Sequence, residues 1–359
     1  MQTRRRHPCH PLWLLVGCFA AWAAANACPV NSEIIGTVRH LYDGALEPDL
    51  AVSTYRNINR LFPTRTIRAG ANPSQLPAAT RPLPDIRFGS GGKDWDLVDY
   101  LAVNRISGLL VIKNGQIARE IYQYGNNDKT CWMSMSVAKS ITSTLIGAAL
   151  KDGAIKSIDD PVTAYVPRLK GSAYEGVSIK DVLMMSSGVA WNETYTDPSS
   201  DRRRLLEAQI AQRPGALLQL MEKLPRAAAP GTVNNYSTGE TQIAGEVLYA
   251  AIRRPLADYL SERIWKPAGM ESDASWWLSA PNSVEVAGSG ISATLRDYGR
   301  FGLFILNAGR IGTKAILPDN WVREAGSRKQ LKNGMPLDYG YFWWPVDATL
   351  AELRGFEPD

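Results

Sequence analysis

Ser136 and Lys139 are the residue pair of this sequence whose types and spacing are best suited to chemistry. They stand three positions apart at the head of a run of small and apolar residues, and residues i and i+3 of a helix share one face. A serine hydroxyl is a useful nucleophile only when a base removes its proton, and a lysine serves when burial keeps its amine neutral. A serine in the first helical turn also lies near free N–H groups that stabilise an oxyanion. The pair predicts nucleophilic attack on a carbonyl.

The Ser-x-x-Lys pattern is short, and its position in the chain decides its value. A second copy, Ser90 to Lys93, stands in a glycine-rich stretch where nothing aligns the two side chains. Ser136 instead follows a predicted hairpin and begins a predicted buried helix. Ser134, the nearest competing serine, has Val137 at its i+3 position and is interpreted as an N-cap.

The scarcity of histidine argues against the hydrolase classes that depend on an imidazole. The chain has three histidines, and all of them precede residue 41 (His7, His10 and His40). Ser-His-Asp and Cys-His mechanisms need an imidazole beside the nucleophile, and zinc hydrolases need metal-binding histidines. A hydrolase built on this sequence would therefore use a lysine, a tyrosine or a carboxylate as its base. The sequence predicts neither a metal nor an organic cofactor.

The elements that would position the pair form an α+β pattern. Asn114-Gly115, between two apolar runs, predicts a β-hairpin. Residues 137–150 have the small and apolar composition of a mostly buried helix. Residues 158–281 are mainly helical, with loops marked by proline and glycine.

Two further segments near the C-terminus carry local signals. Thr294 and Asp297 resemble a capping pair before a helix over residues 295–306. The aromatic run over residues 339–344 is typical of a strand.

Three motifs follow one another along the chain: Ser136-Val-Ala-Lys139, Leu183-Met-Met-Ser-Ser187-Gly188 and Tyr236-Ser237-Thr238. With them, the sequence from about Trp95 to Trp344 resembles the serine β-lactamase and penicillin-binding-protein superfamily. The likeness is greatest to its class C-like esterase and amidase branch, which includes 6-aminohexanoate-oligomer hydrolases. The resemblance implies a β-lactamase-like antiparallel sheet flanked by helices, with an all-helical subdomain.

The resemblance also implies roles for single residues. Tyr236 would lie against the nucleophile and pass a proton to the leaving group. Thr238 stands where the family usually has asparagine, which changes the hydrogen bond expected there. Tyr195 resembles a loop tyrosine that contacts substrate amides, although a turn residue packing on the surface is the alternative. The implied reaction cleaves an amide or ester of a small molecule through an acyl-enzyme on Ser136.

Alternatives to this function stay open. The family's third element, a Lys-Thr-Gly motif or its counterpart on a late strand, does not occur after Tyr339. We therefore expect a fold truncated at its C-terminus, and a non-catalytic or inactive protein is one alternative. A D-Ala-D-Ala peptidase or β-lactamase is another, which the missing Lys-Thr-Gly disfavours.

The N-terminus predicts export. Three arginines, an apolar stretch and a small-residue site at Ala25-Asn26-Ala27 make residues 1–27 a signal peptide, so the protein would be periplasmic or secreted. Cys28 would then come first, which allows a lipid anchor that tethers the protein to the membrane. Cys28 and Cys131 would be the remaining cysteines and could pair.

The same segment explains the net charge. Removing its three arginines lowers +5 to 5 − 3 = +2, which argues against a nucleic-acid partner. We divide the rest of the chain into an extension over residues 28–94, rich in proline in its second half, and a hydrolase domain over residues 95–359.

Overall fold

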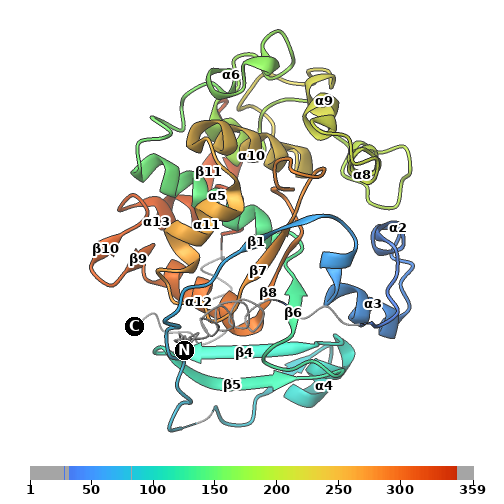
Figure 1. Ribbon diagram of the computed structural model, residues 1–359, viewed down its shortest axis with the longest axis vertical. Coiled ribbons are helices and arrows are strands. Elements are labelled where there is room, and N and C mark those ends of the chain that lie inside the picture. The colour runs from blue at the N-terminus through green and yellow to red at the C-terminus, as the bar shows by residue number, and fades with distance from the viewer. Residues whose placement is uncertain (1–27, 29–31, 82, 346–359) are drawn as a thin grey trace, which may run out of the picture.

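The structure is a computed structural model, which describes residue 28 and residues 32–81 and 83–345. Its largest sheet has four antiparallel strands in the order β1-β7-β8-β6 (Figure 1). All residues of β7 and β8 are buried, so both faces of the sheet are covered. In Figure 1, α5, α11 and α13 lie to the left of this sheet and α2 and α3 to its right. This α+β architecture confirms the predicted fold class.

The elements have the following bounds. The strands are β1 (Thr64–Ile67), β2 (Arg87–Ser90), β3 (Lys93–Asp96), β4 (Gly108–Lys113), β5 (Gln116–Tyr122), β6 (Cys131–Met133), β7 (Ala274–Trp277), β8 (Ile291–Thr294), β9 (Arg310–Ile311), β10 (Lys314–Ala315), β11 (Lys329–Gln330) and β12 (Pro336–Leu337). The helices are α2 (Val38–Tyr42), α3 (Pro48–Tyr55), α4 (Leu97–Val103), α5 (Val137–Lys151), α6 (Val162–Tyr165), α7 (Ile179–Leu183), α8 (Asp201–Ile210), α9 (Ala216–Glu222), α10 (Thr238–Ile252), α11 (Leu256–Leu260), α12 (Leu295–Leu306) and α13 (Trp321–Gly326). Single helical turns are η1 (Ile58–Arg60), η2 (Pro167–Leu169) and the π-helical η3 (Ser261–Trp265).

The predicted hairpin is confirmed as β4 and β5. Asn114 and Gly115 both have positive φ, 50° and 72°, as the tight hairpin turn favoured by Asn-Gly requires. The hairpin forms a sheet of its own, below the larger sheet in Figure 1. Arg296 of α12 donates two hydrogen bonds, of 2.7 and 2.8 Å, to Glu120 of β5 and so joins the hairpin to the helix after β8.

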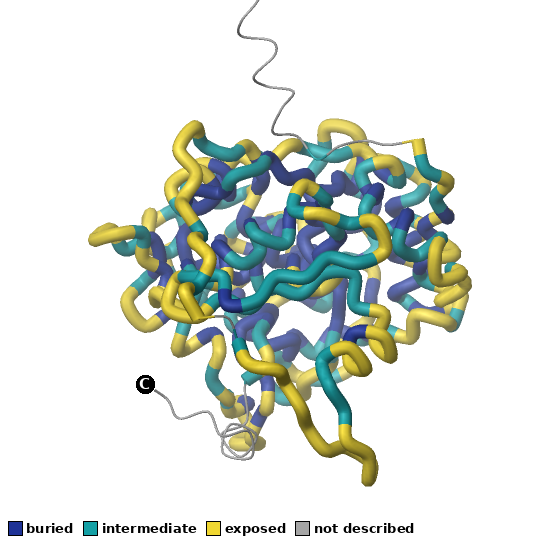
Figure 2. The backbone as a smooth tube through the Cα atoms, turned by 90° about the horizontal axis from the view of Figure 1, so that it is seen from below, coloured by how far each residue is buried: buried dark blue, intermediate teal, exposed yellow. Residues whose placement is uncertain are grey.

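The predicted buried helix is α5, and 11 of its 15 residues are buried. Its small side chains let α10 pack closely against it. The buried hydroxyl of Thr142 donates to the carbonyl of Ala287 at 2.8 Å, whereas the buried Oγ of Ser143 has no hydrogen-bond partner among the described residues. Viewed from below, buried residues occupy the middle of the molecule and exposed residues its rim (Figure 2).

The N-terminal segment takes part in the core. β1 pairs with β7, Ile58, Phe62 and Ile67 are buried, and the indole N–H of Trp277 donates to the carbonyl of Ile58 at 2.8 Å. The division of the chain at residue 94 stays a prediction.

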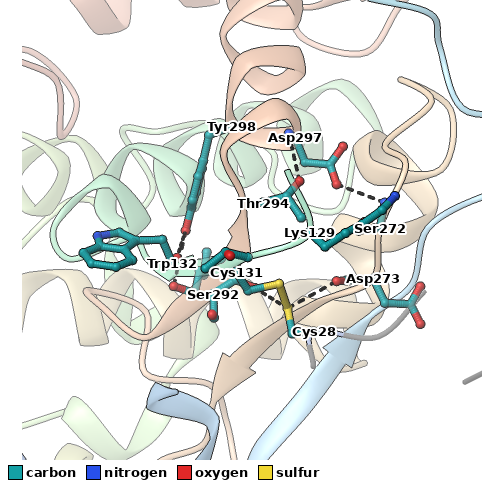
Figure 3. Close-up of a disulfide and its surroundings, with 12 residues drawn as sticks. Cys28, Lys129, Cys131, Trp132, Ser272, Asp273, Ser292, Thr294, Asp297 and Tyr298 are labelled. Carbon is teal, nitrogen blue, oxygen red and sulfur yellow. Dashed lines mark hydrogen bonds between the residues drawn. A yellow bond between two sulfur atoms is a disulfide. The ribbon is translucent and has the colours of Figure 1, made fainter. Parts of the chain in front are cut away.

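A disulfide fixes the start of this segment. Cys28 is bonded to Cys131 of β6, which lies at the opposite edge of the sheet from β1 (Figure 3). The pairing suggested by the cysteine count is present, and it occupies the Cys28 sulfur that a lipid anchor would need.

Three local predictions have different outcomes. The side chain of Thr294 accepts from the N–H of Asp297 at 3.2 Å and caps α12, as expected. The carboxylate of Asp297 does not return the bond; it accepts from the N–H groups of Glu271 and Ser272. Ser134 is not the N-cap of α5, because the helix begins at Val137 and Ser136 holds the N-cap position.

The aromatic run over residues 339–344 is not a strand. Its residues lie in irregular backbone, and Phe342 has a φ of 59°, which no strand residue adopts. The side chains from Tyr339 to Phe342 are nevertheless buried. The predicted truncation concerns the chain beyond residue 345, which lies outside the described residues. No helix of the described part is long and apolar enough to cross a membrane.

Candidate active site

The turn between β6 and α5 places Ser136 at the head of the helix. Ser134 anchors this turn to β8: its N–H donates to the carbonyl of Ile291 at 2.8 Å and its hydroxyl accepts from the N–H of Ile291 at 3.2 Å. Met135 follows with a φ of 45°, a conformation that is costly for a residue with a side chain. The N–H of Ser136 donates to no acceptor among the described residues. The chain thus presents the Ser136 hydroxyl and a free backbone donor together.

Lys139 lies one helical turn further and faces Ser136. Its Nζ is 3.2 Å from the Ser136 Oγ and 3.0 Å from the carbonyl oxygen of Gly288. The residue is only 3% exposed. Burial lowers the pKa of Lys139 to about 7, while Glu193 raises it and Arg202 lowers it further. Near neutral pH a large share of this amine therefore has a free lone pair within reach of the serine proton.

Gly288 is required where it meets this lysine. It belongs to the turn before β8, which brings a backbone carbonyl to the Lys139 amine. A Cβ at Gly288 would lie 3.1 Å from Thr238 Cγ2 and 3.4 Å from Lys139 Nζ. A larger residue would therefore push on both groups.

Tyr236 borders the same pair. The Lys139 Nζ is 5.5 Å from the centre of the Tyr236 ring. Tyr339 packs edge-on against this ring at 6.4 Å and Trp344 stacks on it at 6.1 Å. Burial raises the pKa of Tyr236, and a hydrogen-bonding interaction with Ser136 opposes that rise. The phenol is thus protonated at neutral pH and within reach of the serine oxygen.

Glu193 is a member of the site that sequence reasoning missed. Its carboxylate accepts from the Thr238 N–H at 2.9 Å, from the Thr238 hydroxyl at 2.5 Å and from the Trp191 indole N–H at 2.5 Å. Thr238 donates its hydroxyl proton to Glu193, and its contact with substrate stays a prediction. The signal in the sequence was weak: Glu193 is the one acid in the segment 190–196.

A cleft of about 450 Å³ opens onto the pair. Its lining includes Ser136, Lys139, Tyr195, Thr238 and further residues from distant segments (Leu41, Tyr42, Gly44, Met135, Thr196, Arg202, Gly288 and Ser289). Tyr195, predicted to contact substrate, is therefore at the cleft and 40% exposed. Four of the five predicted residues line the cleft, and Tyr236 borders it through Lys139.

The N-terminal segment supplies one wall of this cleft, which sequence reasoning also missed. Tyr42 of α2 stacks on Tyr195 with ring centres 6.3 Å apart. The second Ser-x-x-Lys copy is in a different setting, since Ser90 and Lys93 are exposed partners in the β2–β3 hairpin. A smaller cavity of about 120 Å³ contains none of the predicted residues. Among the described residues, no group of His, Cys, Asp and Glu is placed to hold a metal ion.

Family comparison agrees with this geometry. Residues 99–356 match the protein family described as Beta-lactamase, which is most of the chain. The chain therefore belongs to the beta-lactamase family, within the superfamily of serine β-lactamases and penicillin-binding proteins.

Individual members of the family are similar to this chain in sequence or in structure. The 6-aminohexanoate-dimer hydrolase of Paenarthrobacter ureafaciens is 26% identical over 316 residues, 84% of this chain and 78% of that protein. A beta-lactamase of Pseudomonas fluorescens is 25% identical over 175 residues, 46% of this chain and 45% of that protein. A solved Bacillus anthracis protein, provisionally assigned as a 6-aminohexanoate-dimer hydrolase, superimposes with a TM-score of 0.74, 22% identity and coverage of 84% and 82%. The last likeness confirms the β-lactamase-like fold, and the family makes the chain a hydrolase.

Proposed function

We propose that this protein cleaves an amide or ester bond through an acyl-enzyme on Ser136, with Lys139 as the base and Tyr236 as the proton carrier. The observation that carries the proposal is the buried Lys139 amine, 3.2 Å from the Ser136 hydroxyl, with a pKa lowered to about 7. A neutral amine replaces the imidazole that the sequence lacks after residue 40.

The reaction follows from the positions of these groups. Lys139 takes the proton of Ser136 as its oxygen attacks the carbonyl carbon. The free N–H of Ser136 stabilises the oxyanion, as helix N-termini do in other acyl-transfer enzymes. Tyr236, still protonated near neutral pH, gives its proton to the leaving group and is reprotonated from Lys139. Water then attacks the acyl-enzyme in the same way and releases the acid.

The class of substrate is inferred from the relatives. One relative, aligned over 84% of this chain, is named for a dimer of 6-aminohexanoate, whose two units are joined by a linear amide. We therefore favour linear amides and esters over β-lactams and D-Ala-D-Ala peptides. The apolar and aromatic lining of the cleft suits an acyl chain.

Export of the protein is part of the proposal. A disulfide between residues 103 positions apart is typical of oxidising compartments, and Cys28–Cys131 is such a bond. This supports a periplasmic or secreted protein, as the residues before Cys28 predict.

A fluorophosphonate probe tests the nucleophile. We expect the wild-type protein to be labelled and Ser136→Ala to escape labelling. Ser90→Ala is the matched control, because Ser90 begins the exposed second copy of the motif, and it should be labelled like the wild type. Labelling that persists in Ser136→Ala would refute the assignment. An unlabelled wild type that also hydrolyses no aryl ester would favour the non-catalytic alternative.

A further inference from the structure

Arg202 has an unusual position in the cleft. It is the second residue of α8, its side chain is 6% exposed, and it lines the same cleft as Ser136. Its side-chain nitrogens donate no hydrogen bond to a described residue, and its Nε is buried without an acceptor. A buried guanidinium normally has acceptors for its five N–H groups, because each unpaired donor is costly.

The two arginines that follow make the contrast. Arg203 is equally buried and its Nε also lacks an acceptor, but its Nη1 donates to Asp43 and to the carbonyl of Tyr195. Arg204 is exposed and donates to Asp201 at 2.9 Å. Of these three consecutive arginines, only Arg202 lacks a hydrogen-bonded acceptor in the described structure, and only Arg202 lines the cleft.

Aromatic rings hold Arg202 in place without using its donors. Its guanidinium carbon lies 4.2 Å from the centre of the Tyr42 ring and 5.9 Å from that of Tyr195. Arg202 forms a long ion pair with Glu193, whose Oε1 is 3.9 Å from the Arg202 Nε, a distance too great for a hydrogen bond. Both Glu193 oxygens already accept from Trp191 or Thr238. The aromatic rings thus orient the guanidinium, but its N–H groups have no hydrogen-bond acceptor among the described residues.

We propose that Arg202 binds a carboxylate of the substrate, so that the enzyme prefers amides or esters that carry a free carboxylate near the scissile bond. The inference rests on the proposed function and deepens it. A guanidinium offers a planar pair of N–H groups that matches a carboxylate, which would supply the missing acceptors. Tyr42 belongs to α2, outside the residues 99–356 that match the family, so this subsite depends on the N-terminal segment of this chain.

Matched pairs of substrates test the inference. The first pair is mono-p-nitrophenyl glutarate, which has a carboxylate on the acyl side of the scissile bond, and its methyl ester, which is neutral there. The second pair is an N-acyl 6-aminohexanoate, which has a carboxylate on the leaving group, and its methyl ester, which is neutral there. We expect the carboxylate form of at least one pair to be favoured about 10- to 100-fold in kcat/KM, the range of a charge-assisted hydrogen bond. Arg202→Gln should bring that ratio close to one, mainly through KM, and Arg202→Lys should restore part of it.

Controls separate the subsite from general electrostatics and from the fold. Arg204→Gln removes an equal charge two residues away and should leave the ratio unchanged. A wild-type ratio near one for both pairs, or an unchanged ratio in Arg202→Gln, would overturn the inference. Ser136-dependent hydrolysis of neutral p-nitrophenyl butyrate would in that case leave the proposed function standing.

A binding measurement tests the carboxylate subsite even if the protein hydrolyses none of these substrates. Ser136→Ala protein should bind glutarate in calorimetry, and the double variant with Arg202→Gln should not, whether or not any ester is hydrolysed. Equal binding by both proteins would also overturn the inference.

Discussion

Replacing Lys139 with methionine should inactivate the protein and stabilise it at neutral pH. Burial lowers the pKa of this amine from 10.5 to about 7, so the folded state binds the lysine proton more weakly than the unfolded state does. The sign follows: below pH 7 the lysine destabilises the fold by its full amount, and the penalty disappears as the pH rises from 7 to 10.5. At pH 7 the penalty is about 4 kcal/mol.

The net gain is smaller than the penalty. Methionine fills a similar volume but cannot donate to Gly288 or Ser136. The loss of these hydrogen bonds lowers the gain in the free energy of unfolding by about 1–2 kcal/mol. We therefore expect Lys139→Met to be more stable than the wild type by about 2–3 kcal/mol at pH 7. Between pH 7 and 9.5 the wild type should gain about 3 kcal/mol relative to the variant, and this change does not depend on the lost contacts.

Urea unfolding at 25 °C, at pH 7 and pH 9.5, measures this difference. Lys93→Met, at the exposed second copy of the motif, is the control and should show no such change. If the wild type and Lys139→Met gain or lose stability in parallel between the two pH values, the amine is not desolvated and the mechanism loses its base. The kcat/KM of the wild type on a neutral ester should rise with pH through the same value, about 7.

Other substitutions test the surroundings of the pair. Glu193→Gln removes the charge that raises the pKa of Lys139, so the midpoint of the pH–rate profile should fall below that of the wild type; a rise would contradict the electrostatic assignment. Tyr236→Phe should lower kcat for an amide by about 100- to 10,000-fold but affect an aryl ester much less, because a phenolate leaves without a proton; equal losses would exclude the proton-carrier role. Cys28→Ser should destabilise the fold by about 2–5 kcal/mol, seen as a lower thermal midpoint that a reductant no longer changes, whereas unaltered reductant sensitivity would mean that Cys28–Cys131 does not form.

Local signals in the sequence predicted the parts of the fold that depend on neighbouring residues. Asn114-Gly115 fixes a hairpin because both residues tolerate positive φ, and no distant contact is needed to choose that turn. The small and apolar residues after Ser136 specify a buried helix in the same way. The pair Ser136 and Lys139 was predictable because one helical turn sets its geometry.

Signals failed where distant segments decide the outcome. Ser134 has the side chain of an N-cap, but its pairing with Ile291 of β8 commits it to the strand end instead. The aromatic run after Tyr339 has strand propensity, yet side-chain packing against Tyr236 and Trp321 governs it. Propensity yields to tertiary contacts at both places.

The residues that shape the cleft were hidden for the same reason. Glu193 looks like one acid in a polar loop until the Thr238 and Trp191 donors are seen to converge on it. Arg202 looks like a solvated helix residue in a run of three arginines, and only the rings of Tyr42 and Tyr195 reveal that it is buried. Spacing cannot reveal these positions, because one partner of each, Thr238 for Glu193 and Tyr42 for Arg202, lies far away in the chain.

The base and the cleft make opposite demands on the same space. Lys139 needs a dry environment to lose its proton, but a dry cleft would also repel a charged substrate. Arg202 resolves the conflict in two ways. Its fixed positive charge lowers the pKa of Lys139, and its guanidinium has N–H groups without acceptors among the described residues that can bind a substrate carboxylate. A bound carboxylate would partly neutralise Arg202 and so raise the pKa of Lys139. The pH–rate midpoint in kcat should therefore lie higher for a carboxylate substrate than for its methyl ester, and an equal or lower midpoint would show that the two sites act independently.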